Sequence, residues 1–403
     1  MENEKRTPKL RFDGFTDEWE IRKLGDVGTI QTCKRIFKEQ TTEEGEIPFY
    51  KNGTIGLKAD AYISREIFEE FKRLYPYPEI GDILISAVGS IGRTAEYTGE
   101  DEYFQDSNVV WLKTDGSISK KYLKAYYQVI EWLIEGSTVK HLYNDNILCS
   151  VLKNPKTLME QERIGLFVEE LDKFISLHQR KVNLLEKSKK FYLQNMFPQK
   201  GEKVPKLRFD GFTDPWEHQK LSEISDKVTE KNKDLAVQET FTNSAEFGVI
   251  SQNDYFDRSI SNADNIGGYY VVRDGDFVYN PRISATAPVG PVNRNKLGRN
   301  GVMSPLYTVF RVHDIDPVYL EWFFKSSCWH RFMFFNGDFG ARSDRFAIKD
   351  AVFFEMPIPT PIIEEQRRIG AFLDEYNSLI TLQNRKLDAL KSMKKFMLQN
   401  MFI

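Results

Sequence analysis

The longest regular pattern in the chain is a heptad repeat of apolar residues, which occurs twice. Residues 160–197 (EQERIGLFVEELDKFISLHQRKVNLLEKSKKFYLQNMF) and 365–402 (EQRRIGAFLDEYNSLITLQNRKLDALKSMKKFMLQNMF) contain no proline and are dominated by helix-forming residues. Apolar residues at alternating steps of three and four predict two long helices with a coiled-coil seam. The predicted seam comprises Ile164, Val168, Leu171, Ile175, Val182, Leu185 and Tyr192 in the first copy, and Ile369, Leu373, Tyr376, Ile380, Leu387, Leu390 and Met397 in the second.

The middle layer of the seam is polar in both copies, with His178 in the first and Gln383 in the second. A single polar layer can fix the register or the partner of a coiled coil, and a tolerated mismatch is the alternative. Acidic residues gather at the start of each copy and basic residues follow, as the helix dipole favours. This distribution also favours an antiparallel pair, because the acidic start of one helix then meets the basic end of the other.

Start and stop signals bound both helices. Thr157 followed by Glu160 forms a capping box, and Pro361 is expected at the first helical position of the second helix. Pro198 and Gly201 end the first helix.

A second repeat opens each half of the chain. Residues 8–20 (PKLRFDGFTDEWE) and 205–217 (PKLRFDGFTDPWE) differ at one position, and we expect Trp19 and Trp216 to anchor this opening motif on a core. Each half therefore consists of an opening motif, a globular stretch and a long helix. The predicted boundaries are 1–157 for the opening motif and first domain, 158–198 for the first long helix, 199–360 for the linker, opening motif and second domain, and 361–403 for the second long helix.

The two globular stretches share an order of elements but little sequence. Each has a Gly-Asp pair followed by a β run, a second β run, an amphipathic helix, a glycine-bearing loop and a last strand-like run. We therefore predict a mixed α/β domain that is used twice. The matching segments are 83–86 and 277–280, 108–113 and 307–312, the helices 120–135 and from 317 onward, and the loops 136–146 and 336–345.

Composition limits the class of protein. A net charge of −3 with 29% charged residues argues against a uniformly basic nucleic-acid coat but permits local basic patches. Cys33, Cys149 and Cys328 form no CxxC pattern and fit free thiols in a reducing compartment. No apolar run approaches the length of a membrane span and the first residues do not resemble a signal peptide, so we expect a cytoplasmic protein without a membrane partner.

Catalytic motifs are missing from the sequence. There is no GxxxxGK[ST] and no HExxH, and Cys328-Trp329-His330 lacks companion metal ligands. Asn280-Pro281-Arg282 resembles the Asn-Pro-Pro-Tyr motif of adenine methyltransferases, but it lacks the second proline and the aromatic residue, so we interpret it as a turn. We predict no catalytic residue, no cofactor and no metal bound by this chain.

Basic loops are the best candidates for a binding site. Residues 277–313 contain five basic residues and no acid, and Arg and Asn are the side chains that read base edges while Lys and Arg hold phosphates. A solvated surface charge is the alternative for each residue. The candidates are Lys51, Asn52, Arg93, Lys140, His141 and Asn144 in the first half, and Arg282, Arg294, Lys296, Arg299, Arg342, Ser343 and Arg345 in the second.

The whole chain resembles the specificity subunit of type I restriction–modification systems. The resemblance is carried by LRFDGFxDxWE at the start of each half, by GDILISAVGSIGR with NVVWLK, by GVISQNDYF, and above all by the duplicated long helix. It implies two target recognition domains separated by two long antiparallel helices in a pseudo-two-fold internal repeat. Each domain would read one half of a bipartite site in double-stranded DNA.

The resemblance also implies a division of labour. The long helices would space the domains and dock the modification subunits, and we expect the seam rows to hold the helices together and to carry this docking. Adenine methylation with S-adenosylmethionine would belong to the modification subunits, and cleavage with ATP and Mg to the restriction subunits.

Two other classes of function remain open. The first is a self-contained DNA methyltransferase or nuclease, which purified chain consuming S-adenosylmethionine alone would support. The second is a coiled-coil scaffold that does not bind DNA, which an absence of DNA binding with the partners present would favour.

Overall fold

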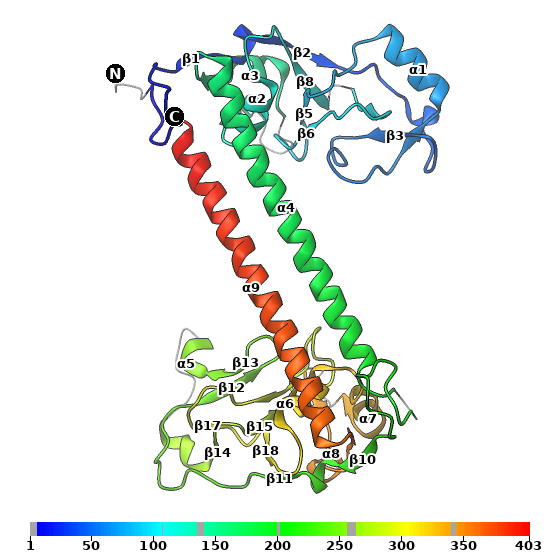
Figure 1. Cartoon of the computed structure of the whole chain (residues 1–403), viewed down its shortest axis with the longest axis vertical. Coiled ribbons are helices and arrows are strands. Elements are labelled where there is room, and N and C mark those ends of the chain that lie inside the picture. The colour runs from blue at the N-terminus through cyan, green and yellow to red at the C-terminus, as the bar shows by residue number, and fades with distance from the viewer. Residues whose placement is uncertain (1–5, 107, 135–140, 200–201, 256–262, 340–343) are drawn as a thin grey trace. The chain divides into compact units, whose positions relative to one another are not determined.

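The computed structural model describes residues 6–106, 108–134, 141–199, 202–255, 263–339 and 344–403. The chain divides into two compact units: the first comprises Met1–Arg180 with Arg385–Ile403, and the second comprises Lys181–Asn384. The two long helices, α4 (Leu158–Asn195) and α9 (Ile363–Met401), each contribute one part to each unit (Figure 1).

A four-stranded antiparallel sheet with the order β2-β8-β5-β6 is the largest sheet described in the first unit. Two smaller sheets, β1-β9 and β4-β3-β7, accompany it. The strands are β1 (Glu20–Lys23), β2 (Gly28–Thr32), β3 (Ile47–Tyr50), β4 (Tyr62–Ile63), β5 (Ile83–Ser86), β6 (Thr94–Glu96), β7 (Tyr103–Phe104), β8 (Val109–Thr114) and β9 (Val151–Asn154), and the short helices are α1 (Arg65–Leu74), α2 (Lys120–Tyr126) and α3 (Asn144–Cys149).

The second unit repeats this sheet in the order β11-β18-β15-β16, again antiparallel throughout. The internal repeat that the sequence predicted is therefore confirmed at the level of the sheet. The strands are β10 (Glu217–Lys220), β11 (Ser225–Lys227), β12 (Phe241–Ser244), β13 (Gly248–Ser251), β14 (Tyr270–Val272), β15 (Phe277–Tyr279), β16 (Val292–Arg294), β17 (Gly301–Met303), β18 (Thr308–Val312), β19 (Asp338–Phe339), β20 (Phe346–Ala347) and β21 (Pro357–Thr360). The helices are α5 (Gln252–Tyr255), α6 (Pro317–Lys325), α7 (His330–Asn336) and α8 (Asp350–Phe353).

The Gly-Asp pairs set the start of the equivalent strands β5 and β15. Gly81 and Gly275 have φ values of +85° and +87°, a backbone region that glycine adopts without strain. The carboxylates of Asp82 and Asp276 are buried, and each accepts the backbone N–H of the residue three positions earlier at 2.8 Å. Each pair thus turns the chain and satisfies its own backbone before the strand begins.

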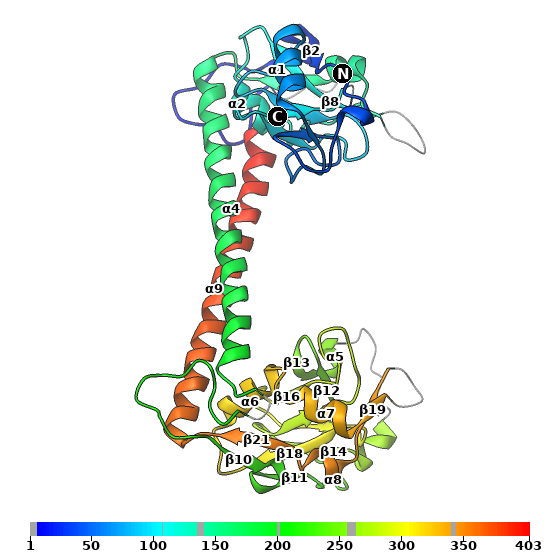
Figure 2. The ribbon, with the colours of Figure 1, turned by 90° about the vertical axis from the view of Figure 1, so that its right-hand side faces the viewer.

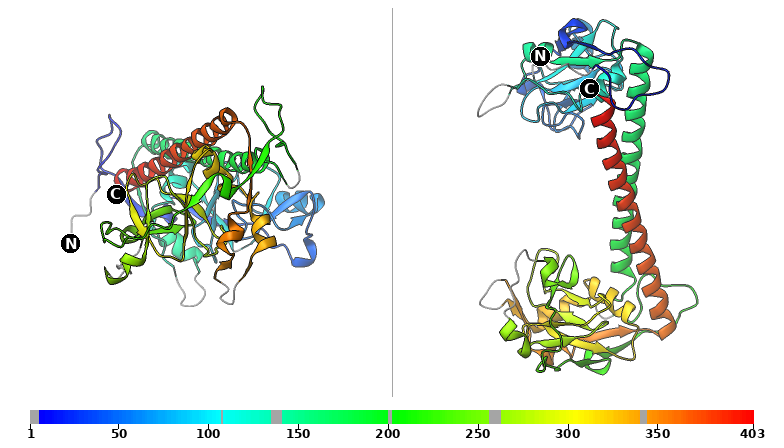
Figure 3. Two further views of the ribbon diagram at one scale, coloured as in Figure 1. Left: turned by 90° about the horizontal axis from the view of Figure 1, so that it is seen from below. Right: turned by 90° about the vertical axis from the view of Figure 1, so that its left-hand side faces the viewer.

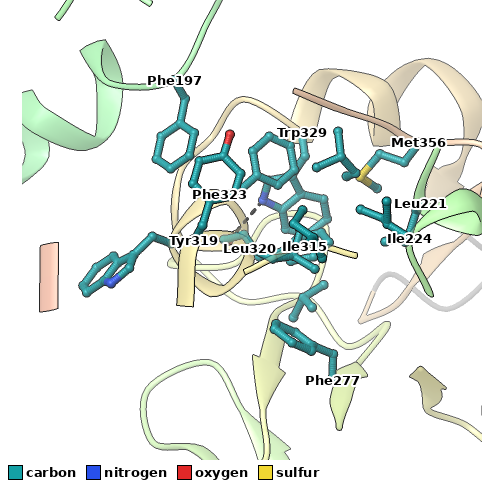
Figure 4. Packing of buried hydrophobic residues seen from close by; sticks show 14 of the residues in the cluster. Phe197, Leu221, Ile224, Phe277, Ile315, Tyr319, Leu320, Phe323, Trp329 and Met356 are labelled. Atoms are coloured by element: carbon teal, nitrogen blue, oxygen red, sulfur yellow. Dashed lines mark hydrogen bonds between the residues drawn. The ribbon is translucent and has the colours of Figure 1, made fainter. Parts of the chain in front are cut away.

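Aromatic side chains around α6 form the core of the second unit (Figure 4). Phe197 lies 5.5 Å from Tyr319 and 5.9 Å from Phe323, measured between ring centroids. In the first unit, Phe402 takes the corresponding place, 5.7 Å from Tyr122 on α2. The repeated LQNMF sequence therefore anchors the end of each long helix in an aromatic core.

The opening motif of the first unit is fixed to α4 by a buried carboxylate. Arg11 donates two hydrogen bonds to Glu160, at 2.7 and 2.9 Å, and Trp19 Nε1 donates a third at 3.4 Å. The dark blue opening motif accordingly lies beside the start of α4 (Figure 3). Because Glu160 is only 2% exposed, the guanidinium supplies the charge compensation that burial of a carboxylate requires.

The second unit contains the same arrangement on α9. Arg208 donates to Glu365 at 2.8 and 2.8 Å, and Trp216 Nε1 donates at 3.1 Å. The green opening motif accordingly lies beside the orange start of α9 (Figure 2). Both tryptophans are buried, so the prediction that Trp19 and Trp216 anchor the opening motif is confirmed.

The glutamine that follows each of these glutamates holds a short helix of the same domain. Gln161 Oε1 accepts the backbone N–H of Ser119, the N-cap of α2, and Gln366 Oε1 accepts that of Asp316, the N-cap of α6, both at 2.8 Å. A Cβ atom on Gly165 would lie 2.5 Å from the backbone of α2, so only glycine permits this approach. The repeated EQxRIG sequence therefore fixes each domain to a long helix.

The two long helices run antiparallel within the first unit. Lys394 forms an ion pair with Asp172, and Lys391 Nζ donates to Gln179 Oε1 at 3.4 Å, so numbers rise along α4 as they fall along α9. The predicted antiparallel pair is confirmed.

Most predicted seam positions are buried or partly buried, and some of them, such as Val168 and Leu373, belong to the domain cores. Burial of these positions accounts for the heptad pattern. A side chain that is buried within the chain is not accessible to another protein. Docking through the seam rows thus stays an untested expectation. Val168, Leu171, Val182, Leu373, Ile380, Gln383 and Leu387 are buried, and Ile175, His178, Leu185 and Leu390 are partly buried.

The structure corrects two helix boundaries. The helix predicted over 120–135 ends at Tyr126, where the N–H groups of Gln128 and Val129 bond to carbonyls only three residues back and tighten the chain into turns. Helix α9 begins at Ile363, so Pro361 lies two residues before it rather than at its first position. The cap at Thr157 is confirmed, since its Oγ1 accepts the N–H of Glu160 at 3.3 Å.

Candidate nucleic-acid interface

Three loops that carry predicted DNA-binding residues meet in the first unit; residues 51–53, 88–93 and 141–144 are called the loop cluster. Asn52 Nδ2 donates to the Val88 carbonyl at 3.0 Å, and Arg93 Nη1 donates to the Gly53 carbonyl at 3.0 Å. The backbone of Val88 also pairs with that of His141 in an antiparallel bridge. Loops far apart in the sequence therefore form one surface.

The loop cluster presents several types of binding group. Lys51 Nζ lies 3.1 Å from Asp60 and its side chain is 40% exposed. The His141 ring stacks on that of Tyr143 at 5.4 Å, and Asn144 is exposed at the start of α3. Tyr143 is itself exposed but was not predicted, although its place between two predicted polar residues was a usable signal.

A basic and aromatic stretch beside the loop cluster was also not predicted. Arg35 is 67% exposed, and its guanidinium lies 5.6 Å from the ring centroid of Phe37, which is exposed too. Arg35 also lies 3.8 Å from Asp106, whose neighbour Gln105 accepts the backbone N–H of Asn52 at 3.2 Å. The interleaving of basic and aromatic residues in CKRIFK, typical of nucleic-acid binding, was the available signal.

In the second unit, Arg282 and Arg345 lie on paired backbone segments. They border a cleft of about 540 Å³, the polar cleft, whose lining includes Asn243, Gln252 and Asn280. Arg282 is exposed, at 3.6 Å from Asp344. Gln252 Oε1 is buried and, among the residues that the structure describes, has no hydrogen-bond donor.

The Asn280-Pro281-Arg282 segment is a turn, as predicted. Asn280 Oδ1 accepts the backbone N–H of Arg282 at 3.0 Å, and its Nδ2 donates to the Asn243 carbonyl at 2.7 Å. The asparagine amide thus closes the turn and joins it to β12.

The basic residues between positions 294 and 300 pair with acids from other segments, and Arg294 and Lys296 share one of them, Glu321. Arg299 donates twice to Glu239, at 2.7 and 2.8 Å, and this hydrogen bonding raises the pKa of the arginine and lowers the pKa of the glutamate. Lys296 lies 3.3 Å from Glu321. Asn295, in the same segment, is buried, and its Nδ2 donates to the backbone carbonyls of Arg273 and Arg299, both at 3.0 Å.

Arg294 occupies the position that Glu96 occupies in the first unit. Each residue pairs across the sheet with the first residue after the Gly-Asp turn. Glu96 binds Lys124 on α2 at 2.5 Å and Arg294 binds Glu321 on α6 at 3.3 Å, and each helix residue lies five positions after its cap. The ion pair is therefore retained with its charges reversed, which gives Arg294 a structural role; its contact with DNA stays a prediction that this geometry disfavours.

Three of the predicted DNA-binding residues cannot be located in the structure. Lys140, Arg342 and Ser343 lie outside the described residues. Within the described ranges, no group of three His, Cys, Asp or Glu side chains is placed to hold a metal ion. No helix in the part of the chain that the structure describes is both long and apolar enough to cross a membrane.

Comparisons with known proteins agree on one family. Residues 16–187 and 213–392 each match the type I restriction modification DNA specificity domain. A Haemophilus influenzae protein named as a type I restriction enzyme specificity subunit is 52% identical over 159 residues, which are 39% of this chain and only 40% of that protein. The protein named as the MjaX specificity subunit of Methanocaldococcus jannaschii is 22% identical over 435 residues, covering 97% of this chain and 94% of its own.

A solved structure has the same fold. The crystal structure of the type I restriction–modification S subunit from M. genitalium matches with a TM-score of 0.59 at 12% identity, over 98% of this chain and 99% of that one. The family match falls on both halves, and each matched half contains one copy of the four-stranded sheet and most of one long helix. The chain belongs to the family of proteins built from the type I restriction modification DNA specificity domain.

Proposed function

We propose that this chain is the non-catalytic DNA-recognition subunit of a type I restriction–modification complex, in which each unit reads one half of a bipartite site in double-stranded DNA. The observation that carries the proposal is a repeated sheet with different loops. The opening motif, the EQxRIG contacts and the sheet order are shared by both units, whereas the loop cluster and the polar cleft are built from different residues. Two equal frames with different surfaces suit two different half-sites.

The two surfaces carry side chains that can read base edges. The amide of Asn52 and the stacked rings of His141 and Tyr143 lie in the first unit. In the polar cleft of the second unit, the buried Oε1 of Gln252 can accept a hydrogen bond from an exocyclic amine, and Arg282 can donate to guanine. Each well-placed bidentate contact contributes about 1–3 kcal/mol of discrimination between bases.

Modification subunits dock, in this proposal, on an apolar stripe outside the seam. Large apolar side chains remain exposed on both long helices, and three pairs of them correspond between the copies: Phe174 and Leu379, Leu177 and Leu382, and Phe191 and Phe396. The exposed apolar residues occupy heptad position g, beside the seam, and position c, next to g on its outer side. In an antiparallel pair the g side of one helix adjoins the g side of the other. The resulting apolar face fits additional helices packed alongside. The stripe consists of Phe174, Leu177, Leu184, Phe191, Leu379, Leu382, Met393 and Phe396.

Catalysis and its cofactors belong to the partner subunits in this proposal. The support comes from the sequence, which has neither the P-loop motif for ATP nor a complete methyltransferase motif. S-adenosylmethionine would serve the modification subunits, and ATP with Mg the restriction subunits.

Methylation mapping tests the proposal directly. Host DNA carrying the intact genes should show methylated adenines at one bipartite sequence, and deletion of this chain should abolish them. Exchange of residues 215–360 for those of a relative should change one half-site and leave the other unchanged. Methylation that persists without the chain, or turnover of S-adenosylmethionine by the purified chain alone, would overturn the proposal.

A further inference from the structure

A second cleft in the second unit contains several lysines. It has a volume of about 620 Å³ and lies among β16, α6 and the parts of α4 and α9 that belong to this unit. We call it the lysine cleft. Its cationic lining residues are Lys189, Arg294, Lys296 and Lys325, and its acidic ones are Glu246, Glu321 and Asp374.

Two of the three acids of the lysine cleft are engaged by other side chains. Glu321 is shared by Arg294 and Lys296, and Asp374 accepts a hydrogen bond from Trp322 Nε1 at 2.8 Å. Glu246 is exposed at the turn between β12 and β13. The lining therefore carries one more positive than negative charge.

Two of the lysines are held by neutral amides rather than by carboxylates. Lys189 Nζ donates to Asn377 Oδ1 at 2.6 Å and lies 5.0 Å from the Trp322 ring, and Lys325 Nζ donates to Asn293 Oδ1. Desolvation lowers the pKa of both lysines. The carboxylate of Glu321 opposes this shift at Lys325, where the charges of Lys189 and Lys296 lower the pKa further, and the charge of Glu186 opposes the shift at Lys189. These hydrogen bonds position the ammonium groups without neutralising them.

At the equivalent position in the first unit, the lysine is paired with a carboxylate. Lys394 corresponds to Lys189 and pairs with the carboxylate of Asp172, which corresponds to Asn377. At the position of Lys325, nine residues after the helix cap, the first unit has Gln128, which donates to Asp172 at 3.4 Å. Two differences between the repeats, Asp to Asn and Gln to Lys, thus each add one positive charge to the second unit only.

We propose that the lysine cleft binds a phosphate group of the DNA backbone through Lys189, Lys296 and Lys325. This inference rests on the proposed function and adds a backbone contact that the second unit makes and the first does not. Ammonium groups converging on an open cleft of this size suit an oxyanion. Such a contact would set the position of the second unit on the duplex without reading sequence.

The position of the cleft favours DNA over a carboxylate from a docked subunit. Four residues of the long helices line it, and none of them is at position g or c: Lys189 is at heptad position a, Asp374 at b, and Leu193 and Asn377 at e. The apolar stripe occupies positions g and c, on the opposite side of each helix. A subunit packed on the stripe would leave the lysine cleft open.

The repeat supplies substitutions for the test. Lys325→Gln and Asn377→Asp each introduce the residue that the first unit already has at the matching position, so both should fold. In the complex with the modification subunits, the affinity for target DNA is measured from about 50 to 200 mM salt. Each variant should reduce the slope of log affinity against log salt by about one, because one phosphate contact releases about one counterion. Binding to target and non-target DNA should weaken by the same factor.

Lys206→Gln, which removes an exposed lysine outside the cleft, is the matched control and should leave the slope unchanged. An unchanged slope for both cleft variants would overturn the inference, as would a loss confined to target DNA. If the variants assemble less tightly with the modification subunits, and the complex that does form has an unchanged salt slope, the inference is overturned and the cleft is assigned to a protein carboxylate. Failure of the unaltered complex to bind any DNA would overturn the proposed function itself.

Discussion

Exchanging the charges of the Arg294–Glu321 pair distinguishes a structural arginine from a DNA-reading one. Arg294→Glu alone places two carboxylates together, and Glu321→Lys alone places two cations together beside Lys296. The double variant restores opposite charges in the order that Glu96 and Lys124 have in the first unit. If the pair is structural, the double variant should be more stable than either single variant.

The expected size follows from burial. Both side chains are 15% exposed, and disruption of a fully buried ion pair costs about 3–5 kcal/mol. Partial exposure and the mobility of Lys296, which is 53% exposed, reduce this to about 2–3 kcal/mol for each single variant. The double variant should lie within about 1 kcal/mol of the unaltered protein, since the interaction energy of a contacting pair is recovered when both partners change.

Chemical unfolding of the full chain, with tryptophan fluorescence as the probe, gives the double-mutant cycle. Trp322 and Trp329 lie in the second unit and report on it. The reasoning would be refuted by additive effects, because residues that do not interact show no coupling energy. DNA binding by the double variant supplies the second result: a stable protein that has lost its target would identify Arg294 as a DNA contact.

Three further predictions concern the helices, the opening motif and the thiols. Phe174→Asp, in the apolar stripe, should leave the unfolding temperature of the chain almost unchanged but abolish its co-elution with modification subunits on a sizing column; normal assembly would contradict the docking surface. Glu365→Gln leaves Arg208 without its buried counter-charge and should lower the free energy of unfolding by about 3 kcal/mol in a denaturant titration. A decrease below about 1 kcal/mol would contradict the stabilising role of the Arg208–Glu365 pair. A thiol reagent at pH 8 should label exposed Cys149 quickly and Cys33 only after unfolding, because burial raises the pKa of Cys33 to about 12 and keeps its thiol protonated. Rapid labelling of Cys33, located by peptide mapping, would refute this.

Elements with a strong local signal could be predicted from the sequence. The heptad pattern identified both long helices, and the Gly-Asp pairs marked the start of β5 and β15. These predictions succeeded because backbone geometry and side-chain period act within a few residues. The duplicated opening motif also indicated the burial of Trp19 and Trp216, although not the carboxylates that hold them.

The order of residues could not predict which charges form ion pairs in the folded protein. The stretch around Arg294 and Arg299 contains no acid, but Glu321 and Glu239 reach it from 27 and 60 residues away. Side-chain ion pairs depend on distances in the folded chain, so a local count of charges overestimates a basic patch. The predicted loop residues Asn52, Arg93 and His141 do lie together in the folded first unit, and their contact with DNA stays a prediction.

The internal repeat separates what holds a domain from what the domain can recognise. Among the residues that the structure describes, the side chains of Glu160 and Glu365 bind residues of the two opening motifs, and those of Gln161 and Gln366 bind backbone groups. These contacts therefore do not depend on a loop side chain. Loops can therefore change while the attachment of each domain to its helix stays the same. The charge-reversed ion pair extends this argument into the domain, because a contact can be retained while both of its residues differ. A change of DNA specificity should consequently require new loop residues and no change in the EQxRIG segments.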